Sequence, residues 1–307
     1  MNEHTVNSLT ELFTFVFDKG SAFFNSDDLF IFRGQEDSKW GLVPAIFRNY
    51  LAVGDSRVSR ETPVYDMAGG ISLVKIRQIC EIERVIYREF FERLRAYPQI
   101  QVNRNALWEM LCIAQHFGVP TRLLDWTDNL SIAAYFSVVK SPKKNGAIWC
   151  LNATQVAAIH NLPSFRNLMD KKGGVSRIDD LPHDASFFTP RDPGIAQPIR
   201  LNDPQYGFRI LQPPDMEQRI KSQGSFFTVD VTTNDYNDNE HDSHTHYDHA
   251  ELCNNLLLKI TIRSKSKREV KKDLEKIGTN YKQIFPDLYG IGMYLSDMRE
   301  DLILKRL

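Results

Sequence analysis

A compact group of side chains that could do chemistry lies near the middle of the chain. It combines an imidazole, a guanidinium, a carboxylate, an indole and a hydroxyl, from His116, Arg122, Asp125, Trp126 and Thr127. Imidazole titrates near neutral pH and can act as a general base. Guanidinium binds phosphates and carboxylates through parallel hydrogen bonds. The residue types therefore predict a catalytic or ligand-binding site in this stretch.

Most of these residues also have a simpler structural interpretation. An apolar helix is expected over residues 130–139, and Asp125 or Thr127 can cap its N-terminus. Trp126 can belong to the core, and His116 can interact with the C-terminal end of the preceding helix. Because basic, acidic, aromatic and hydroxyl side chains occur together here, which is more than a helix cap requires, a functional site is slightly favoured over a purely structural role.

A second candidate is Arg33, which follows the apolar run Phe30-Ile31-Phe32. The run predicts a buried strand that ends at the arginine, and Gly34 leaves the guanidinium sterically open. Arg33 can bind a phosphate or carboxylate, or form a structural ion pair, for instance with Asp125. The two residues are far apart in the chain, so the sequence does not establish that they meet.

A histidine-rich tract over residues 241–249 contains four histidines and two aspartates, which are potential metal ligands. Its surroundings are polar throughout and offer no apolar scaffold, so a surface insertion is expected and no metal site. The sequence also lacks a P-loop, a dinucleotide-binding glycine motif after a strand, a GxSxG elbow and an HExxH motif. P-loop hydrolases, Rossmann enzymes, α/β-hydrolases and common zinc proteases are therefore disfavoured.

The composition predicts a globular protein of 307 residues with 42% hydrophobic residues and a net charge of −1. Such a charge provides no overall field for binding nucleic acid or an anionic membrane. The four cysteines are widely spaced without a CxxC pair, which favours a reducing compartment. With no signal pattern at the N-terminus and no membrane-length apolar run, a cytoplasmic location without membrane binding is expected.

The hydrophobic patterns predict helices and strands in irregular alternation, which indicates an α+β fold in one domain. A capping-box pattern, Ser8-x-x-Glu11, predicts the first helix. Further helices are expected at residues 72–97, 107–116, 130–139, 155–160 and 267–277, and from 286 onward. Strands are expected at residues 30–32, 146–151, 208–211, 225–231 and 256–262.

The order and spacing of these motifs resemble the FRG domain, which is named for its Phe-Arg-Gly motif. The matching blocks are Phe32-Arg33-Gly34-Gln35 and residues 115–127, 133–136, 219–226 and 285–288. The blocks extend over about residues 8–295. The resemblance thus implies one domain over residues 1–307, with a polar insertion near 234–249.

The resemblance further implies a remote similarity to ADP-ribosyltransferases, with a split, mostly antiparallel sheet flanked by helices. By this similarity NAD is the expected substrate, Arg33, Asp125 and Thr127 are candidate catalytic residues, and Glu217 is a tentative acid. His116 has no settled counterpart in the transferases and is a further candidate catalytic residue because it is close to Arg122 and Asp125 in sequence. Residues expected to bind NAD are Arg33, Gly34, Gln35, Arg122, Trp126, Tyr135 and Gln223.

Two functions are therefore expected from the resemblance and the residues together. The first is an NAD-dependent ADP-ribosyltransferase or NAD hydrolase, a bacterial toxin or phage-defence effector with an unknown protein or nucleic-acid acceptor. The second is a non-catalytic module for binding a ligand or protein. In that case the FRG and DWT motifs hold the fold together through an ion pair between Arg33 and Asp125.

Overall fold

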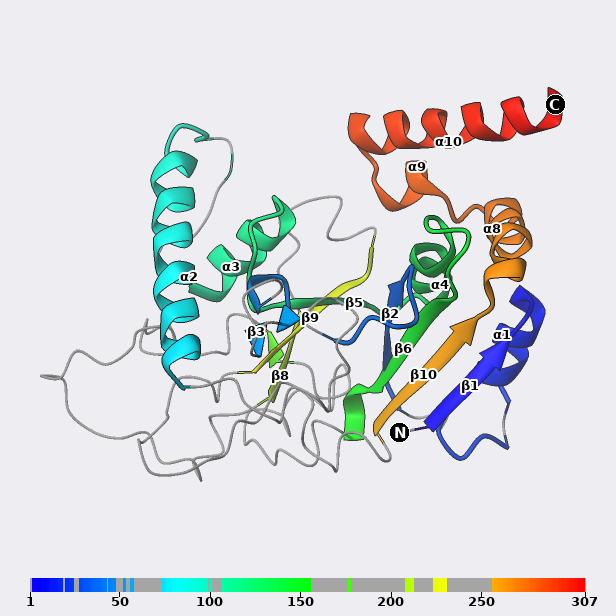
Figure 1. The fold of residues 1–307 in the computed structure, drawn as a ribbon, viewed down its shortest axis with the longest axis horizontal. Coiled ribbons are helices and arrows are strands. Elements are labelled where there is room, and N and C mark those ends of the chain that lie inside the picture. The colour runs from blue at the N-terminus through cyan, green and yellow to red at the C-terminus, as the bar shows by residue number, and fades with distance from the viewer. Residues whose placement is uncertain are drawn as a thin grey trace, which may run out of the picture.

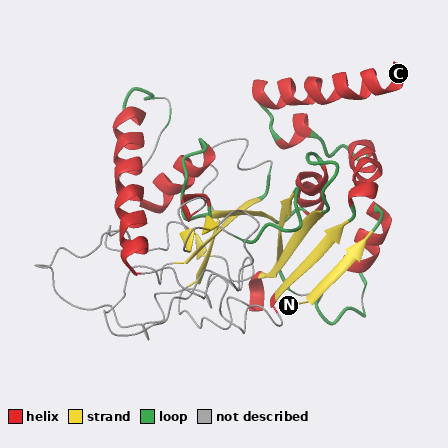
Figure 2. Cartoon of the chain, in the orientation of Figure 1, coloured by secondary structure: helices red, strands yellow, loops and turns green. Residues whose placement is uncertain are grey.

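The computed structural model describes residues 2–18, 20–24, 28–42, 44–47, 52–53, 56–57, 73–98, 100, 107–155, 176–177, 208–212, 223–230 and 256–306. Structural statements concern these residues. They form one large sheet with helices packed on it, which confirms the α+β class (Figure 1, Figure 2). Among them, no helix combines the length and apolar character needed to cross a membrane.

Eight strands form the sheet in the spatial order β1-β10-β6-β2-β5-β9-β8-β7. They are β1 (Asn2–Val6), β2 (Phe30–Gln35), β5 (Leu124–Thr127), β6 (Gly146–Asn152), β7 (Ser176–Arg177), β8 (Phe208–Gln212), β9 (Ser225–Asp230) and β10 (Leu257–Ile262). Two short strands, β3 (Ala52–Val53) and β4 (Ser56–Arg57), pair separately. Within the large sheet only the two outer pairs, β1 with β10 and β7 with β8, are parallel. The expectation of a mostly antiparallel sheet is confirmed.

The sheet is nearly divided in two between β2 and β5. These strands pair only at Phe32 and Thr127, whereas β2 pairs with β6 along its full length. One half of the sheet therefore contains β1, β10, β6 and β2, and the other contains β5, β9, β8 and β7 (Figure 1). Continuing the antiparallel register would set Gly34 opposite Asp125, but no backbone pairing forms there.

Helices cover both halves of the sheet. They are α1 (Leu9–Val16), α2 (Leu73–Leu94), α3 (Leu107–His116), α4 (Leu130–Val138), α8 (Lys267–Lys276), α9 (Tyr281–Ile284) and α10 (Leu288–Arg306). Helices α1, α4 and α8 lie by the β2–β6–β10 half, and α2 and α3 lie by the other (Figure 1). Helices α9 and α10 follow α8 in the chain, and α10 lies above α4 and α8 in the view of Figure 1.

Two apolar cores lie on opposite faces of the central strands. Strand β6 is buried at every position, and its Ile148 and Cys150 belong to one core while Trp149 and Leu151 belong to the other. This alternation follows the two-residue period of a strand. The predicted buried strand at 146–151 is therefore confirmed, extended by one residue.

The glycine of the Phe-Arg-Gly motif allows α4 to approach β2 closely. A Cβ built on Gly34 would lie 1.9 Å from the carbonyl oxygen of Ala133, which is backbone of α4. Because these atoms are backbone, and not the end of a flexible side chain, they cannot easily move aside to make room for a side chain at position 34. Helix α4 is thereby held directly over the strand that carries Arg33.

Several local predictions are corrected. Asp125, Trp126 and Thr127 belong to β5 instead of lying at a helix N-terminus, and the N-cap of α4 is Asn129, whose Oδ1 accepts from the backbone N–H groups of Ser131 and Ile132. Arg33 lies inside β2, paired with Trp149 of β6, and not at the strand's end. Most of the helix expected at residues 155–160 falls outside the described residues.

Other expectations at the helix ends are confirmed. Ser8 caps α1 by accepting from the N–H of Glu11, and the Glu11 carboxylate accepts from the N–H of Asn7. Strand β1 and helix α9 were not predicted. Strand β1 is short and carries Glu3, His4 and Thr5, so its sequence contains no apolar run, and it lies at the edge of the sheet, paired with the apolar strand β10.

Replacing Gly34 with alanine tests the close approach of α4 to β2. Gly34→Ala is expected to lower the free energy of unfolding by about 1–3 kcal/mol or more, because the added methyl collides with backbone. The matched control is Gly292→Ala in α10, where an added Cβ meets nothing within 4 Å. Since alanine is the better helix former, this variant should gain up to about 1 kcal/mol. Equal stability of the two variants in urea would contradict the packing described.

Candidate functional site

Arg33 bridges the gap between the two halves of the sheet. Its Nη1 donates to the carbonyl oxygen of Asp125 at 2.7 Å and lies 3.5 Å from the Asp125 carboxylate. The side chain of Arg33 is 14% exposed and that of Asp125 is 57% exposed. The structure therefore brings together the two candidate residues that the sequence left unconnected.

The Nε of Arg33 is buried and has no hydrogen-bond partner among the residues that the structure describes. A buried N–H of a charged group without an acceptor costs several times the net value of an ordinary hydrogen bond. Such a donor is uncommon in a folded protein and calls for an explanation by a bound molecule or a functional role. The Nη1 of Arg33 thus joins the two halves of the sheet, while its Nε is left able to donate to an acceptor on a bound molecule.

A chain of hydrogen bonds orients the Asp125 carboxylate. Gln115 Nε2 lies 3.0 Å from both carboxylate oxygens, and Thr121 Oγ1 donates to Gln115 Oε1 at 2.5 Å. The same Thr121 hydroxyl accepts from the N–H of Leu123 at 3.0 Å. Because each group is fixed by the next, the carboxylate is held in place although it is exposed. Gln115 and Thr121 were not among the predicted site residues, although both lie in the motif block 115–127.

Thr127 and Gln223 join β5 to the turn before β9. Thr127 Oγ1 donates to the Gln223 carbonyl oxygen at 2.5 Å and accepts from the N–H of Asn129 at 3.0 Å. Gln223 Nε2 in turn donates to the carbonyl oxygen of Ile284 at 3.3 Å. The Thr127 hydroxyl therefore has two structural partners, and it holds the turn before β9 and the start of α4 against β5.

A cavity of about 390 Å³ opens where these residues meet, and we call it the Asp125 cavity. Seven of the predicted site residues line it: Arg33, Gly34, His116, Asp125, Trp126, Thr127 and Gln223. Gln115 and several apolar side chains complete the wall. His116 is the last residue of α3 and packs edge to face on Phe117, with ring centroids 5.0 Å apart.

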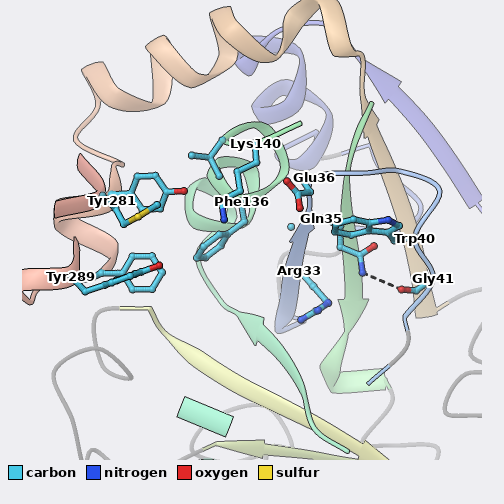
Figure 3. A pocket seen from close by; sticks show the side chains of 13 residues that line it. Arg33, Gln35, Glu36, Trp40, Gly41, Phe136, Lys140, Tyr281 and Tyr289 are labelled. Carbon is cyan, nitrogen blue, oxygen red and sulfur yellow. Dashed lines mark hydrogen bonds between the residues drawn. The ribbon is translucent and has the colours of Figure 1, made fainter. Parts of the chain in front are cut away.

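A second cavity of about 250 Å³ adjoins the first, and we call it the aromatic pocket. Its lining side chains include Trp40, Phe136, Tyr281, Phe285 and Tyr289, together with Gln35, Glu36 and Lys140 (Figure 3). The two cavities share four lining residues: Arg33, Gly34, Phe136 and Phe285. Arg33 therefore lies in the wall common to both.

Arg122 does not reach either cavity. Its guanidinium is 2% exposed and pairs with Glu83 of α2, with Nε lying 2.9 and 3.1 Å from the two carboxylate oxygens. Tyr87 donates to the same carboxylate at 2.8 Å, and burial together with the Glu83 charge raises the pKa of Tyr87 well above its ordinary value. The structure therefore assigns Arg122 to an interior ion pair that ties α2 to the segment before β5.

The two aromatic residues expected to bind NAD, Tyr135 and Trp126, are core residues. Tyr135 is fully buried, lines neither cavity, and packs edge to face on Tyr281 with centroids 5.4 Å apart. Trp126 is 3% exposed, and its indole N–H donates to Thr228 at 2.9 Å. Tyr135 therefore has no contact with either cavity, and Trp126 offers the Asp125 cavity little exposed surface. The rings that do line both cavities, Phe136 and Phe285, were not predicted as site residues.

Gln35 lines the aromatic pocket but is held by two structural bonds. Its amide donates to the Gly41 carbonyl oxygen at 3.1 Å and accepts from the indole of Trp149 at 2.8 Å. Glu217, the tentative acid, and the histidine-rich tract 241–249 lie outside the described residues. Within the described part of the chain, no three potential metal ligands come together.

Comparison with known families identifies part of the chain. Residues 28–146 match the model of the FRG domain, and this segment includes Arg33, Gly34 and the hydrogen-bonded group around Asp125. The chain contains an FRG domain. The blocks at 219–226 and 285–288 lie beyond the matched segment of the FRG domain. No curated protein and no solved structure matches the chain.

The Arg122 assignment predicts a loss of stability that a ligand-binding arginine would not cause. Arg122→Met should lower the free energy of unfolding by about 3–5 kcal/mol, because Glu83 is then left buried without a counter-charge. The double variant Arg122→Met/Glu83→Leu should recover much of this loss. The matched control is Arg95→Met, whose guanidinium is 60% exposed beside Glu92 and should contribute less than about 1 kcal/mol. An unchanged urea midpoint for Arg122→Met would contradict the ion-pair role.

Proposed function

We propose that the FRG-domain chain binds NAD across the two adjoining cavities and cleaves its bond to nicotinamide, as an ADP-ribosyltransferase or NAD hydrolase. The observation that carries the proposal is the buried, unpartnered Nε of Arg33 in the wall that both cavities share. A guanidinium donor suits a phosphate. In a dinucleotide the phosphates lie between two ring systems, which matches a donor placed between two cavities.

The Asp125 cavity offers the groups that cleavage of the nicotinamide bond requires. Breaking this bond passes through an oxocarbenium-like state, which a nearby carboxylate stabilises electrostatically. Asp125 is the one carboxylate among the described residues that line this cavity, and Gln115 holds it in orientation. The Nη1 of the neighbouring Arg33 lies 3.5 Å from the same carboxylate.

The hydrolysis reaction can be written with these groups. Water attacks C1′ of the ribose, the bond from C1′ to the nicotinamide nitrogen breaks, and its electron pair leaves with nicotinamide. The proton released from water passes to a base, and His116 is the candidate because it lines the cavity. In transfer, a nucleophilic group of the acceptor takes the place of water. Support for an ADP-ribosyltransferase-like fold comes from the divided sheet with an arginine beside the division.

The non-catalytic alternative also has a specific observation in its favour. Arg33, Gly34 and Gln35 all make structural contacts: a bond to the Asp125 carbonyl, close packing on α4, and bonds to Gly41 and Trp149. In a non-catalytic binding module, these structural contacts would be the whole role of Arg33, Gly34 and Gln35. The buried Nε of Arg33 is the feature that the structural interpretation leaves unexplained. The toxin or phage-defence role, the acceptor and the cytoplasmic location remain predictions.

Nicotinamide release from NAD by the purified protein tests the proposal. Release should fall at least 100-fold in Arg33→Ala, because the phosphate donor is lost. It should fall by a similar factor in Asp125→Asn, because the charge that stabilises the oxocarbenium is lost. Arg299→Ala, which removes an exposed arginine from α10, is the control and should keep full activity. Absence of release, no rise in melting temperature with NAD, and an Arg33→Ala variant that only unfolds earlier would together establish the binding-module alternative.

A further inference from the structure

We propose that the aromatic pocket is the binding site for the adenine base of the dinucleotide. The proposal rests on NAD as the substrate, and it assigns the two halves of the molecule to different cavities. The adenine lies in the aromatic pocket, the phosphates lie at Arg33, and the nicotinamide ribose lies beside Asp125. Together the cavities fall within the range of about 300–1,000 Å³ typical of ligand sites.

The walls of the aromatic pocket suit a flat ring system. Phe285 packs edge to face on Phe136 and on Tyr289, with centroids 6.0 Å apart in both pairs. Tyr281 lies 6.0 Å from the Phe285 ring at a tilt of 34°. Figure 3 shows Tyr281 and Tyr289 on one side of the pocket and Trp40 on the other. Aromatic side chains arranged in this way bind a base by stacking on its face.

The charges in the pocket distinguish a base from other flat or cationic ligands. Aromatic pockets with a carboxylate, here Glu36, often take quaternary ammonium groups. Arg33 and Lys140 line the same pocket, and two positive charges disfavour a cationic ligand. A neutral base attached to a phosphate satisfies both requirements, because Arg33 meets the phosphate while the ring remains uncharged.

Glu36 supplies a hydrogen-bond acceptor for the exocyclic amine of adenine. The hydroxyl of Ser141 donates to Glu36 Oε2 at 3.0 Å and so fixes the carboxylate. Burial, assisted by nearby acidic groups, raises the pKa of Tyr281 to about 12, so its hydroxyl remains a neutral donor or acceptor near pH 7. The pocket thus offers polar groups at the edge of the ring as well as stacking faces.

A buried lysine holds the backbone at Glu36 and Lys140, two of the three charged residues that line the pocket. Lys267 of α8 is 1% exposed, and its ammonium donates to the carbonyl oxygens of Glu36 at 2.7 Å, Lys140 at 3.1 Å and Ser141 at 3.2 Å. It therefore joins the turn after β2 to the C-terminal end of α4. A pocket fixed in this way loses little entropy when a ligand binds.

Binding of the two halves of NAD, measured separately by calorimetry, tests the assignment. The probes are adenosine monophosphate and nicotinamide mononucleotide. Tyr289→Ala should weaken binding of adenosine monophosphate by about 5- to 100-fold, the usual effect of losing one stacking ring, and leave nicotinamide mononucleotide unaffected. The matched control is Tyr97→Ala: Tyr97 is 54% exposed, against 60% for Tyr289, and lines neither cavity. It should bind both probes as the parent does.

A second variant tests recognition of the amine. The parent should prefer adenosine monophosphate to inosine monophosphate, which carries an oxygen where adenine has its amine, and Glu36→Gln should reduce this preference at least several-fold. No binding of adenosine monophosphate, or equal binding by the parent and Tyr289→Ala, would overturn the assignment. If NAD is not cleaved but Tyr289→Ala still weakens adenosine monophosphate selectively, the proposed reaction fails and the base-binding pocket stands.

Discussion

The hydrogen bond from Arg33 to the Asp125 carbonyl replaces the backbone pairing that β2 and β5 lack. Beyond Phe32 and Thr127 the two strands no longer form a ladder, and an unpaired carbonyl inside a sheet is costly. The long side chain of Arg33 reaches this carbonyl, so the sheet stays joined although its strands have separated.

The same gap creates the candidate site. Where β2 and β5 separate, the Asp125 cavity opens between them, and α4 closes it from one side because Gly34 admits the helix backbone. Arg33 therefore both joins the two halves of the sheet and forms part of the cavity wall. This double role explains why its guanidinium is only partly satisfied: Nη1 is used by the fold, and Nε faces a region with no protein acceptor among the described residues.

Much of the fold follows from local patterns in the sequence. The buried strand β6, the long helix α2 and the cap of α1 were predicted because apolar period and capping chemistry are local signals. The cap of α4 was misplaced, because Asp125 and Thr127 are good capping types and only the pairing of β5 with β9 shows that they belong to a strand. Strand β1 was missed because its partner β10 follows it by some 250 residues in the chain, and a pattern read over a short stretch of sequence does not show such a distant pairing.

The site was predictable only in part for the same reason. Arg33 and Asp125 were both predicted as site residues, with an ion pair between them as one alternative, and the structure places them in contact. Arg122 was assigned to the site because it is close to Asp125 in sequence, but it lies in the segment before β5 and its guanidinium pairs with Glu83 of α2 instead. The aromatic pocket was not predicted, although Phe136 and Phe285 lie in the motif blocks 133–136 and 285–288, because its rings come from three separate segments: the turn after β2, helix α4 and the α9–α10 region.

The most direct test of the account is the state of Arg33 Nε when a diphosphate ligand binds. Its N–H resonance can be observed by NMR of arginine-labelled protein and assigned by its absence in Arg33→Lys. On titration with ADP-ribose, we expect this resonance to shift and its exchange with water to slow, as a phosphate oxygen fills the missing acceptor position. An unchanged Arg33 resonance at saturating ADP-ribose, or no binding of ADP-ribose, would contradict Arg33 as the phosphate ligand between the two cavities.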